Sequence, residues 1–169
     1  MSLISFFKEA GQKLFGHKEA EAAAQQAKTK PDDAALKTQV AQANQAAATA
    51  IEQYIGTQNL KADGLKVEFD GASGAVTVAG VAQTQEVKEK IVLCCGNVTG
   101  VAQVNDMLTV AQPAEESRYY TVVKGDTLSA IAKTHYGNAN AYMKIFEANK
   151  PMLTHPDKIY PGQLLRIPA

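Results

Sequence analysis

Residues 119–168 carry a pattern of apolar residues and chain breakers that few folds satisfy. An apolar run over 119–123 meets a polar turn, in which Asp126 is expected to be the N-cap of a helix. Apolar residues then recur at the spacing of one helix face, at Leu128, Ile131, Ala132 and Tyr136. Gly137 ends that helix, residues 142–149 outline a second one, and residues 164–167 form a closing strand. The sequence therefore predicts a small β-α-α-β unit.

Residues 51–110 predict a second unit with a different order of elements. The end of a helix is followed by a β-hairpin, with strands over 65–70 and 75–79 around a turn at 71–74. Valine and phenylalanine alternate with polar residues in both strands, which gives the hairpin one buried face: Val67, Phe69, Val76 and Val78. An amphipathic helix over 83–95, a glycine-bracketed loop over 96–101 and a strand over 104–110 follow. The predicted order is α-β-β-α-β.

Residues 3–50 have patterns that predict helices. Apolar residues in segment 3–15 recur at helical spacing, so we expect an amphipathic helix interrupted by Gly11: Leu3, Phe6, Phe7, Ala10, Leu14 and Phe15. Residues 18–50 are rich in alanine and glutamine. Pro31 is expected to break one helix there, and Asp32 or Asp33 to cap the next. This segment has few large apolar residues, so it predicts a helical arm with little core of its own.

Composition narrows the classes of function. The 169 residues carry zero formal net charge, so strong attraction to nucleic acid or to an anionic membrane is not expected. No apolar run reaches membrane-spanning length and the N-terminus lacks a secretory pattern, so we expect a cytoplasmic protein without stable membrane insertion. Cys94 and Cys95 are neighbours, which favours reduced, buried thiols over a disulfide. The three histidines lack metal-ligand spacing and no nucleophile has a base beside it, so we expect no enzyme.

Two segments resemble known domain families. The motifs YTVVKGDTLSAIA and IYPGQLLRIP, at the two ends of residues 119–168, resemble a LysM domain. The motifs GAVTVAGVAQTQEVKEKI and GVAQVNDMLTV resemble a BON domain. With the N-terminal FFKEAGQKLFG, they resemble the bacterial cytoplasmic potassium-binding proteins that consist of one BON and one LysM domain. The resemblance covers residues 1–16 and about 50–168, and fails over the longer, alanine-rich stretch between them.

The resemblance implies an α+β fold with a BON domain, preceded by a helical arm, and a C-terminal LysM domain. The expected segments are an N-terminal amphipathic segment (1–17), an alanine-rich helical insertion (18–50), the BON domain (51–111), a linker (112–118) and the LysM domain (119–169). It also implies selective, reversible binding of K⁺ coupled to compaction of the two domains. A monomeric sensor or buffer of potassium, acting in homeostasis or osmotic stress, is the expected function.

A potassium site needs several oxygen ligands at relatively long distances, and backbone carbonyls supply them in channel filters. Carboxylate clusters would instead favour Ca²⁺ or Mg²⁺, and this sequence has none. Irregular backbone near glycines is where carbonyls stay outside secondary structure, which favours the surroundings of Gly11 and the loop over 96–101. The family resemblance guides the choice of individual carbonyl ligands: Phe7, Ala10, Gln12, Gly96, Val98 and Val101.

Two other functions remain open from the sequence. LysM domains commonly bind polymers of N-acetylglucosamine, and the resemblance places such a groove between the first β-α loop and the second α-β loop. The residues lining it would be Asp126, Thr127, Leu128, Pro151, Met152 and Ile159. BON domains are often linked to phospholipid contact, and the amphipathic N-terminal segment could lie on a bilayer. Burial of its apolar residues against the BON domain is the competing explanation.

Overall fold

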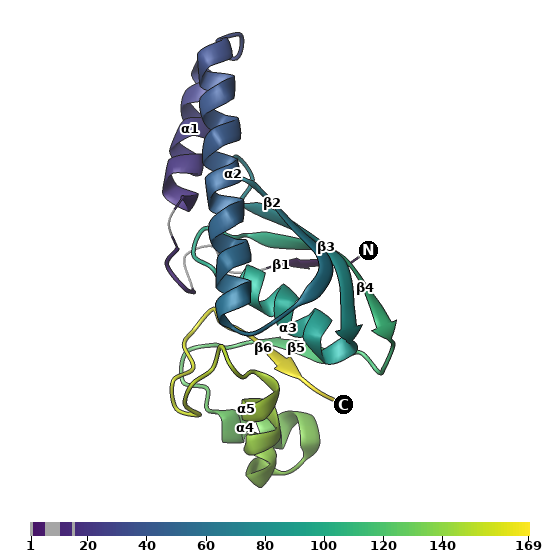
Figure 1. Ribbon diagram of the computed structural model, residues 1–169. Coiled ribbons are helices and arrows are strands. Elements are labelled where there is room, and N and C mark those ends of the chain that lie inside the picture. The colour runs from purple at the N-terminus through teal and green to yellow at the C-terminus, as the bar shows by residue number, and fades with distance from the viewer. Residues whose placement is uncertain (1, 6–10, 15) are drawn as a thin grey trace.

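The computed structural model describes residues 2–5, 11–14 and 16–169. It contains two packed units with separate hydrophobic cores, and a helical hairpin that projects from the first unit (Figure 1). We call them the sheet unit, which contains every element from β1 to β4, and the C-terminal unit, which contains every element from β5 to β6, in the order given below. This arrangement confirms the predicted α+β fold. In chain order the elements are β1 (Ser2–Ser5), α1 (His17–Thr29), α2 (Ala34–Thr57), β2 (Ala62–Asp70), β3 (Ala75–Thr84), α3 (Gln85–Gly96), β4 (Gln103–Gln112), β5 (Arg118–Thr121), α4 (Leu128–Tyr136), the 3₁₀ helix η1 (Ala139–Ala141), α5 (Tyr142–Ala148) and β6 (Leu164–Ile167).

The sheet unit is built on the predicted hairpin. The Asp70 carboxylate accepts hydrogen bonds from the Ala72 amide and the Ser73 hydroxyl, which stabilises the turn between β2 and β3. The four alternating apolar residues of the hairpin are all buried, as predicted. They pack against Ile51 and Ile55 of α2 and Ile91 of α3, so both helices cover the same face of the sheet. Exposed residues such as Met107 lie on the opposite face.

The sheet has the strand order β1-β4-β3-β2, with β3 and β4 parallel and the other pairs antiparallel. Parallel neighbours need a long connection, and α3 provides it by packing back onto the sheet. β1 adds to the far edge of β4, where Leu3 lies opposite Asn105.

The prediction of an N-terminal helix over 3–15 is therefore wrong for its first residues, which form β1. Residues 11–14 are not helical either. The reason is that the free edge of β4 offers hydrogen-bond partners to an extended segment, and periodicity within the segment does not reveal that edge. Leu14 packs against the core of the sheet unit. Phe6, Phe7, Ala10 and Phe15 lie outside the described residues.

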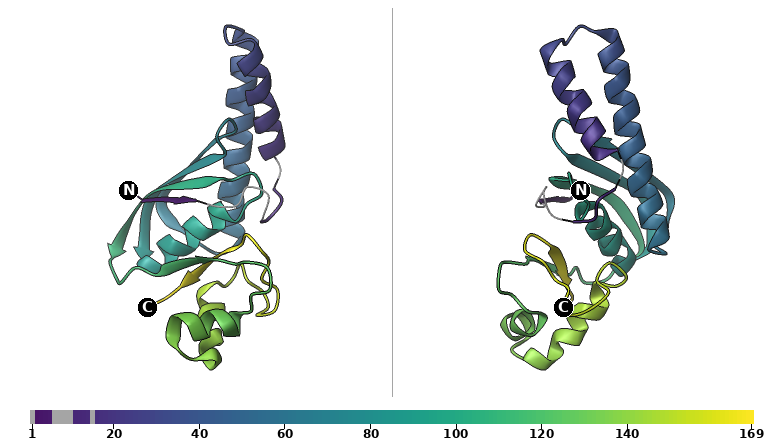
Figure 2. Two further views of the ribbon diagram at one scale, coloured as in Figure 1. Left: turned by 180° about the vertical axis from the view of Figure 1, so that it is seen from behind. Right: turned by 90° about the vertical axis from the view of Figure 1, so that its left-hand side faces the viewer.

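The helical arm consists of α1 and the first half of α2, which run antiparallel (Figure 2). As predicted, the arm turns at Pro31, and the Asp33 carboxylate caps α2 by accepting from the amides of Ala35 and Leu36. The contact between the helices is made by small residues: Ala20, Ala24, Ala47 and Ala48 are all buried. α2 continues without a break past residue 50, the expected end of the insertion, and its last turns enter the core of the sheet unit.

The C-terminal unit has the predicted β-α-α-β order, with β5 and β6 antiparallel and both helices packed on one side of them (Figure 1). Gly137 ends α4 in a left-handed conformation, with φ of 71°. The predicted N-cap is wrong by one residue, because the Thr127 hydroxyl accepts from the Ala130 amide. The Asp126 carboxylate instead accepts from the Tyr120 hydroxyl and the Val123 amide, which stabilises the loop before the helix.

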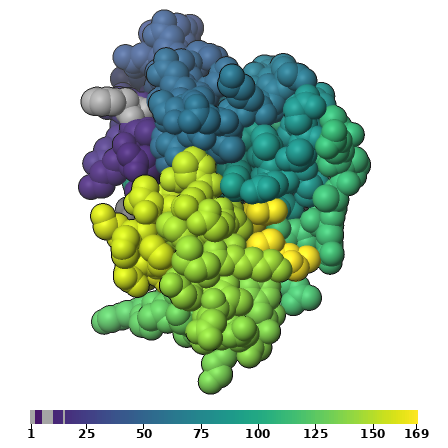
Figure 3. All heavy atoms as spheres, turned by 60° about the horizontal axis from the view of Figure 1, so that its bottom comes forward, coloured from purple at the N-terminus to yellow at the C-terminus, as the bar shows by residue number. Residues whose placement is uncertain are grey.

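The two units are in direct contact. β6 lies against α3, and in Figure 3 the yellow residues of the C-terminal strand lie beside the teal atoms of the sheet unit. Met152, in the loop after α5, packs against the core of the sheet unit rather than its own. The guanidinium Nε of Arg166 on β6 lies 2.5 Å from Oε2 of Glu89 on α3, and both side chains are buried. No helix in the described part of the chain has the length and apolar character needed to cross a bilayer.

Candidate functional site

The candidate site lies at the C-terminal end of α3. Thr84 caps the start of this helix, and every residue from Ile91 to Gly96 is buried. The helix ends where the Asn97 amide donates to the carbonyl of Leu93. Among the described residues, no hydrogen bond uses the carbonyl oxygens of the next three residues, Cys94, Cys95 and Gly96. Uncommitted carbonyls at the negative end of a helix dipole are a favourable place for a cation.

The N-terminal segment docks onto the loop that follows this helix. The Gln12 amide donates to the Asn97 carbonyl at 2.7 Å, and the Thr99 amide donates to the Gln12 carbonyl at 2.9 Å. The Thr99 hydroxyl adds a hydrogen bond of 3.0 Å to the carbonyl of Gly11. The structure thus brings together the two segments that sequence reasoning selected, although they are far apart in the chain.

Glycine is required where the segments meet. Gly11 has φ of 113°, and a Cβ placed on it would overlap the Asn97 carbonyl. Gly100 has φ of 95°, and a Cβ there would lie 2.7 Å from Cδ2 of His17. Both positions therefore combine a left-handed backbone with contact too close for a side chain.

The predicted carbonyl ligands differ in whether they already accept a hydrogen bond. The expectation that these carbonyls are free of hydrogen bonds is wrong for Gln12 and Val98, whose oxygens accept from the amides of Thr99 and Val101. Gln12 pairs with Val98 in an isolated parallel bridge, and the hydrogen bond from Thr99 uses one of the two lone pairs of the Gln12 carbonyl. The carbonyls of Gly96 and Val101 accept no hydrogen bond from the described residues. Phe7 and Ala10 lie outside the described residues.

The groups that could bind an ion at this site are neutral. The described residues contain no cluster of three histidine, cysteine, aspartate or glutamate side chains able to hold a metal ion. Burial raises the pKa of the Cys95 thiol to about 12, and it also raises the pKa of Cys94. Both thiols therefore stay protonated near neutral pH and supply no thiolate ligand. The donors that remain are backbone carbonyls, which suit a large monovalent cation.

Asn97 connects this site to the C-terminal unit. Its side-chain amide donates to the Leu164 carbonyl at 3.0 Å and accepts from the Leu164 amide at 3.1 Å. Sequence reasoning included Asn97 only as part of the loop and assigned it no role. Its partner is 67 residues away, so no local pattern could have identified the contact.

A second polar cluster joins the units along α3. Glu89 accepts hydrogen bonds from Gln85, from the Ser117 amide and from Arg166. Burial opposes the ionisation of Glu89, but these hydrogen bonds outweigh burial and lower its pKa below the ordinary value of 4.5. The buried pair with Arg166 was not anticipated from the sequence. Since a buried charge requires a partner, this cluster forms a second contact between α3 and β6, separate from the one at Asn97.

The residues predicted to line a glycan groove do not share one open surface. Leu128 is buried in the core of the C-terminal unit, and Ile159 packs against the same core. Met152 packs against the sheet unit. Thr127 and Pro151 are exposed, and Asp126 is partly buried in its loop.

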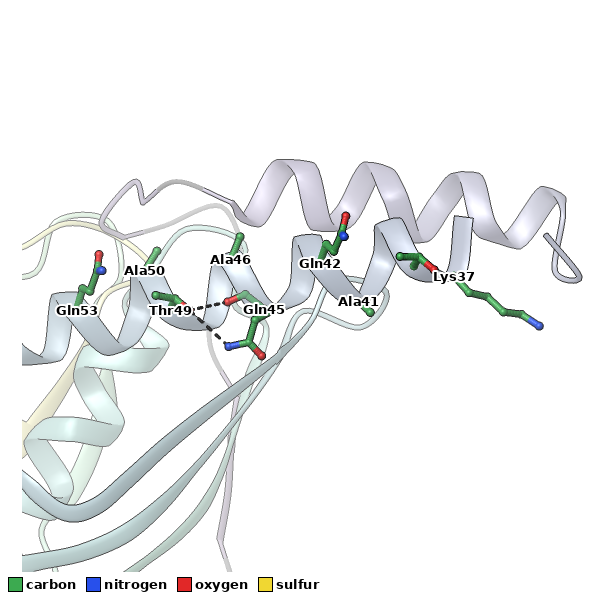
Figure 4. A pocket seen from close by; sticks show the side chains of 9 residues that line it. Lys37, Ala41, Gln42, Gln45, Ala46, Thr49, Ala50 and Gln53 are labelled. Carbon is green, nitrogen blue, oxygen red and sulfur yellow. Dashed lines mark hydrogen bonds between the residues drawn. The ribbon is translucent and has the colours of Figure 1, made fainter. Parts of the chain in front are cut away.

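A shallow hollow along one face of α2 is lined by residues of that helix alone (Figure 4). Its lining combines three alanines, Ala41, Ala46 and Ala50, with threonine and glutamine side chains. Gln45 and Thr49 bond to each other within it. Lys37 is its one charged side chain, and Figure 4 shows it extended along the helix. This lining contains no carboxylate, imidazole or thiol side chain.

Two family models match the chain, the BON domain over residues 43–112 and the LysM domain over residues 120–168. The chain is 46% identical over 168 residues to the potassium binding protein Kbp of Escherichia coli O6:H1, a match that covers 99% of each protein. It is 43% identical over 83 residues to an uncharacterized protein of Deinococcus radiodurans, which covers 43% of this chain and 32% of that protein.

Proposed function

Because the chain belongs to the BON–LysM family of the potassium binding protein Kbp, we propose that it binds K⁺ at the end of α3. The observation that carries the proposal is that the carbonyls of Cys94, Cys95, Gly96 and Val101, beside the docked N-terminal segment, accept no hydrogen bond from any described residue. These oxygens lie at a buried helix end, where water competes little for an ion. Residues 6–10 would extend the ligand set from the N-terminal side, with Phe7 and Ala10 as the expected donors.

The donor set favours K⁺ over divalent cations. Ca²⁺ and Mg²⁺ are held by carboxylates, and the two acidic residues that flank this stretch of the chain are already paired, Glu89 with Arg166 and Asp106 with Lys88 at 3.1 Å. Neutral carbonyls replace the weakly held hydration shell of K⁺ without an excess of negative charge.

Ion binding would hold the N-terminal segment and the 96–101 loop together, and so compact the BON and LysM domains. A monomeric protein of this kind would serve as a reversible sensor or buffer of K⁺ in the cytoplasm, in potassium homeostasis or osmotic stress, without catalysis. The family of its relative supports binding rather than enzymatic activity.

Isothermal titration calorimetry of potassium-free protein with KCl, and with NaCl as the control, tests the proposal. We expect saturable one-site binding of K⁺ and no saturable heat with Na⁺. The Gly100→Val variant should lose most of this affinity, because its side chain would displace His17 and distort the loop. Gly125→Val is the matched control, since Gly125 also has a positive φ but nothing lies near its Cβ position. Absence of K⁺ binding by the unchanged protein would refute the function.

Calorimetry also tests the alternative that the LysM domain binds a glycan. Chitin oligosaccharides added to the protein, with and without K⁺, should give no saturable heat, because Met152 and Leu128 are committed to packing. Binding that survives the loss of K⁺ would support the glycan function instead.

A further inference from the structure

Every hydrogen-bonding group of Asn97 is engaged, and each engages a different part of the fold. The backbone amide ends α3 at Leu93, and the backbone carbonyl holds the N-terminal segment at Gln12. The side-chain amide forms a two-bond pair with Leu164, the first residue of β6 in the LysM domain. One residue thus joins the last turn of α3, the N-terminal segment and the other domain.

The pair with Leu164 copies the way in which a neighbouring strand would bond to β6. A side-chain amide that donates and accepts at the same residue fixes both its own direction and the backbone from which it extends. Leu164 is buried, so its amide and carbonyl would lack partners if Asn97 were absent. The contact is therefore more constraining than a single exposed hydrogen bond.

Because Asn97 directly follows Gly96 in the chain, the constraint on its side chain also affects the proposed ion ligands. Its neighbour Gly96 has a carbonyl that accepts no hydrogen bond from the described residues, and the carbonyl of Asn97 itself accepts from the Gln12 amide. Fixing the side chain of Asn97 on β6 limits rotation of the peptide groups on either side. Ligands that are held in place before binding lose less entropy when the ion arrives.

We propose that Asn97 is a positioning residue, through which strand β6 of the LysM domain holds the ion-binding loop in its binding conformation. The inference rests on the proposed K⁺ function and assigns to the LysM domain a role in ion affinity without any contact with the ion. Coupling of this kind is reciprocal, so K⁺ must also strengthen the contact between Asn97 and Leu164.

The first test uses the unchanged protein. Hydrogen exchange of the Leu164 amide, followed by NMR in K⁺ and in Na⁺, should slow by about tenfold or more when K⁺ binds. The Arg166 amide is the internal control, because it lies on the same strand but bonds to the Asn149 side chain. Equal slowing at both amides would indicate general stabilisation and overturn the inference, as would no slowing at Leu164.

The second test compares two variants by calorimetry. Asn97→Ala removes the pair with Leu164, and we expect the Kd for K⁺ to rise at least about fivefold, the lower end of typical coupling. Arg166→Gln weakens the same interface at Glu89 and leaves Asn97 untouched, so its Kd should stay within about twofold. Equal weakening in both variants would assign the effect to the interface as a whole and overturn the role of Asn97.

The outcomes separate the two proposals. If the unchanged protein binds K⁺ and Asn97→Ala binds it equally well, the positioning role fails and the potassium function stands. If the unchanged protein does not bind K⁺, both fail. Should Asn97→Ala not fold, the exchange measurement on the unchanged protein still decides.

Discussion

At the scale of single residues, the site depends on direct contact between the backbone of the N-terminal segment and the backbone of the 96–101 loop. Gly11 lies against the Asn97 carbonyl, and its missing side chain lets the amide of Gln12 reach the same oxygen. Any other residue at position 11 would add both a steric overlap and the strain of a positive φ.

We expect Gly11→Ala to lower the free energy of unfolding by more than about 2 kcal/mol, as a clash with rigid backbone does. Gly137→Ala is the matched control, because Gly137 also has a positive φ but nothing within 4 Å of its Cβ position. That variant should lose only the conformational term, about 1 kcal/mol. Urea denaturation measures both, and equal losses would show that the N-terminal segment is not docked as described.

The cap of α4 gives a second prediction at this scale. Replacing Thr127 with Ala removes the acceptor for the Ala130 amide and should lower the free energy of unfolding by about 1 kcal/mol. Thr134→Ala on the same helix should be nearly neutral, because its hydroxyl only donates to the Ala130 carbonyl within the helix. Thermal denaturation monitored by circular dichroism compares them, and a similar loss in both would contradict the assignment of the cap.

At the scale of elements, the arm packs through alanine. Ala20 of α1 is fully buried, and it touches both α2 and the turn at Gly71, where a Cβ would overlap the Ala20 backbone. Small side chains let the two helices approach closely, but they bury little apolar area. The arm therefore depends on close fit more than on a large core.

We expect Ala20→Leu to lower the free energy of unfolding by about 1–3 kcal/mol, because no space exists for the added atoms. Ala22→Leu, at an exposed position of the same helix, should change it by less than about 0.5 kcal/mol. Chemical denaturation with helix-sensitive circular dichroism measures the difference. A neutral Ala20→Leu would mean that α1 does not dock on α2 and the turn.

At the scale of the whole molecule, the buried pair of Glu89 and Arg166 ties the two domains together. The folded state lowers the pKa of Glu89, so its charge contributes stability above the ordinary carboxylate range. This contribution is lost as the pH falls through the folded-state pKa, because the unfolded state then binds the proton more strongly.

We expect stability to fall as the pH is lowered below about 4.5, and Glu89→Gln to reduce that dependence. Unfolding by urea at several values between about pH 3 and pH 7 gives the slope. Asp70→Asn is the comparison, since Asp70 also has a lowered pKa, from the Ser73 hydroxyl, but its hydrogen-bond partners lie in the turn between β2 and β3. If the Glu89 charge holds the two domains together, acid should separate them in the unchanged protein. Small-angle scattering measures this separation, which we expect to be smaller in Glu89→Gln and unchanged in Asp70→Asn. The same reduction in Asp70→Asn would contradict it.

Local sequence patterns specify most of the secondary structure, and longer motifs identify both domains. The hairpin between β2 and β3, the stop at Gly137 and the cap at Asp33 follow from interactions within a few residues, and local patterns contain that information. The cap at Thr127 was missed by one position, because two adjacent polar residues compete for it and only the loop geometry assigns Asp126 to Tyr120.

The contacts between distant segments follow from the way the chain packs and not from local patterns. Leu3 belongs to a strand because β4, about a hundred residues away, offers a free edge. Among the described residues, the carbonyls of Gln12 and Val98 accept hydrogen bonds and those of Gly96 and Val101 accept none, and the bond at Gln12 depends on how the N-terminal segment docks. Asn97 with Leu164, and Glu89 with Arg166, meet across 67 and 77 residues. Periodicity records which side of an element is buried, but not which distant residue completes each hydrogen bond.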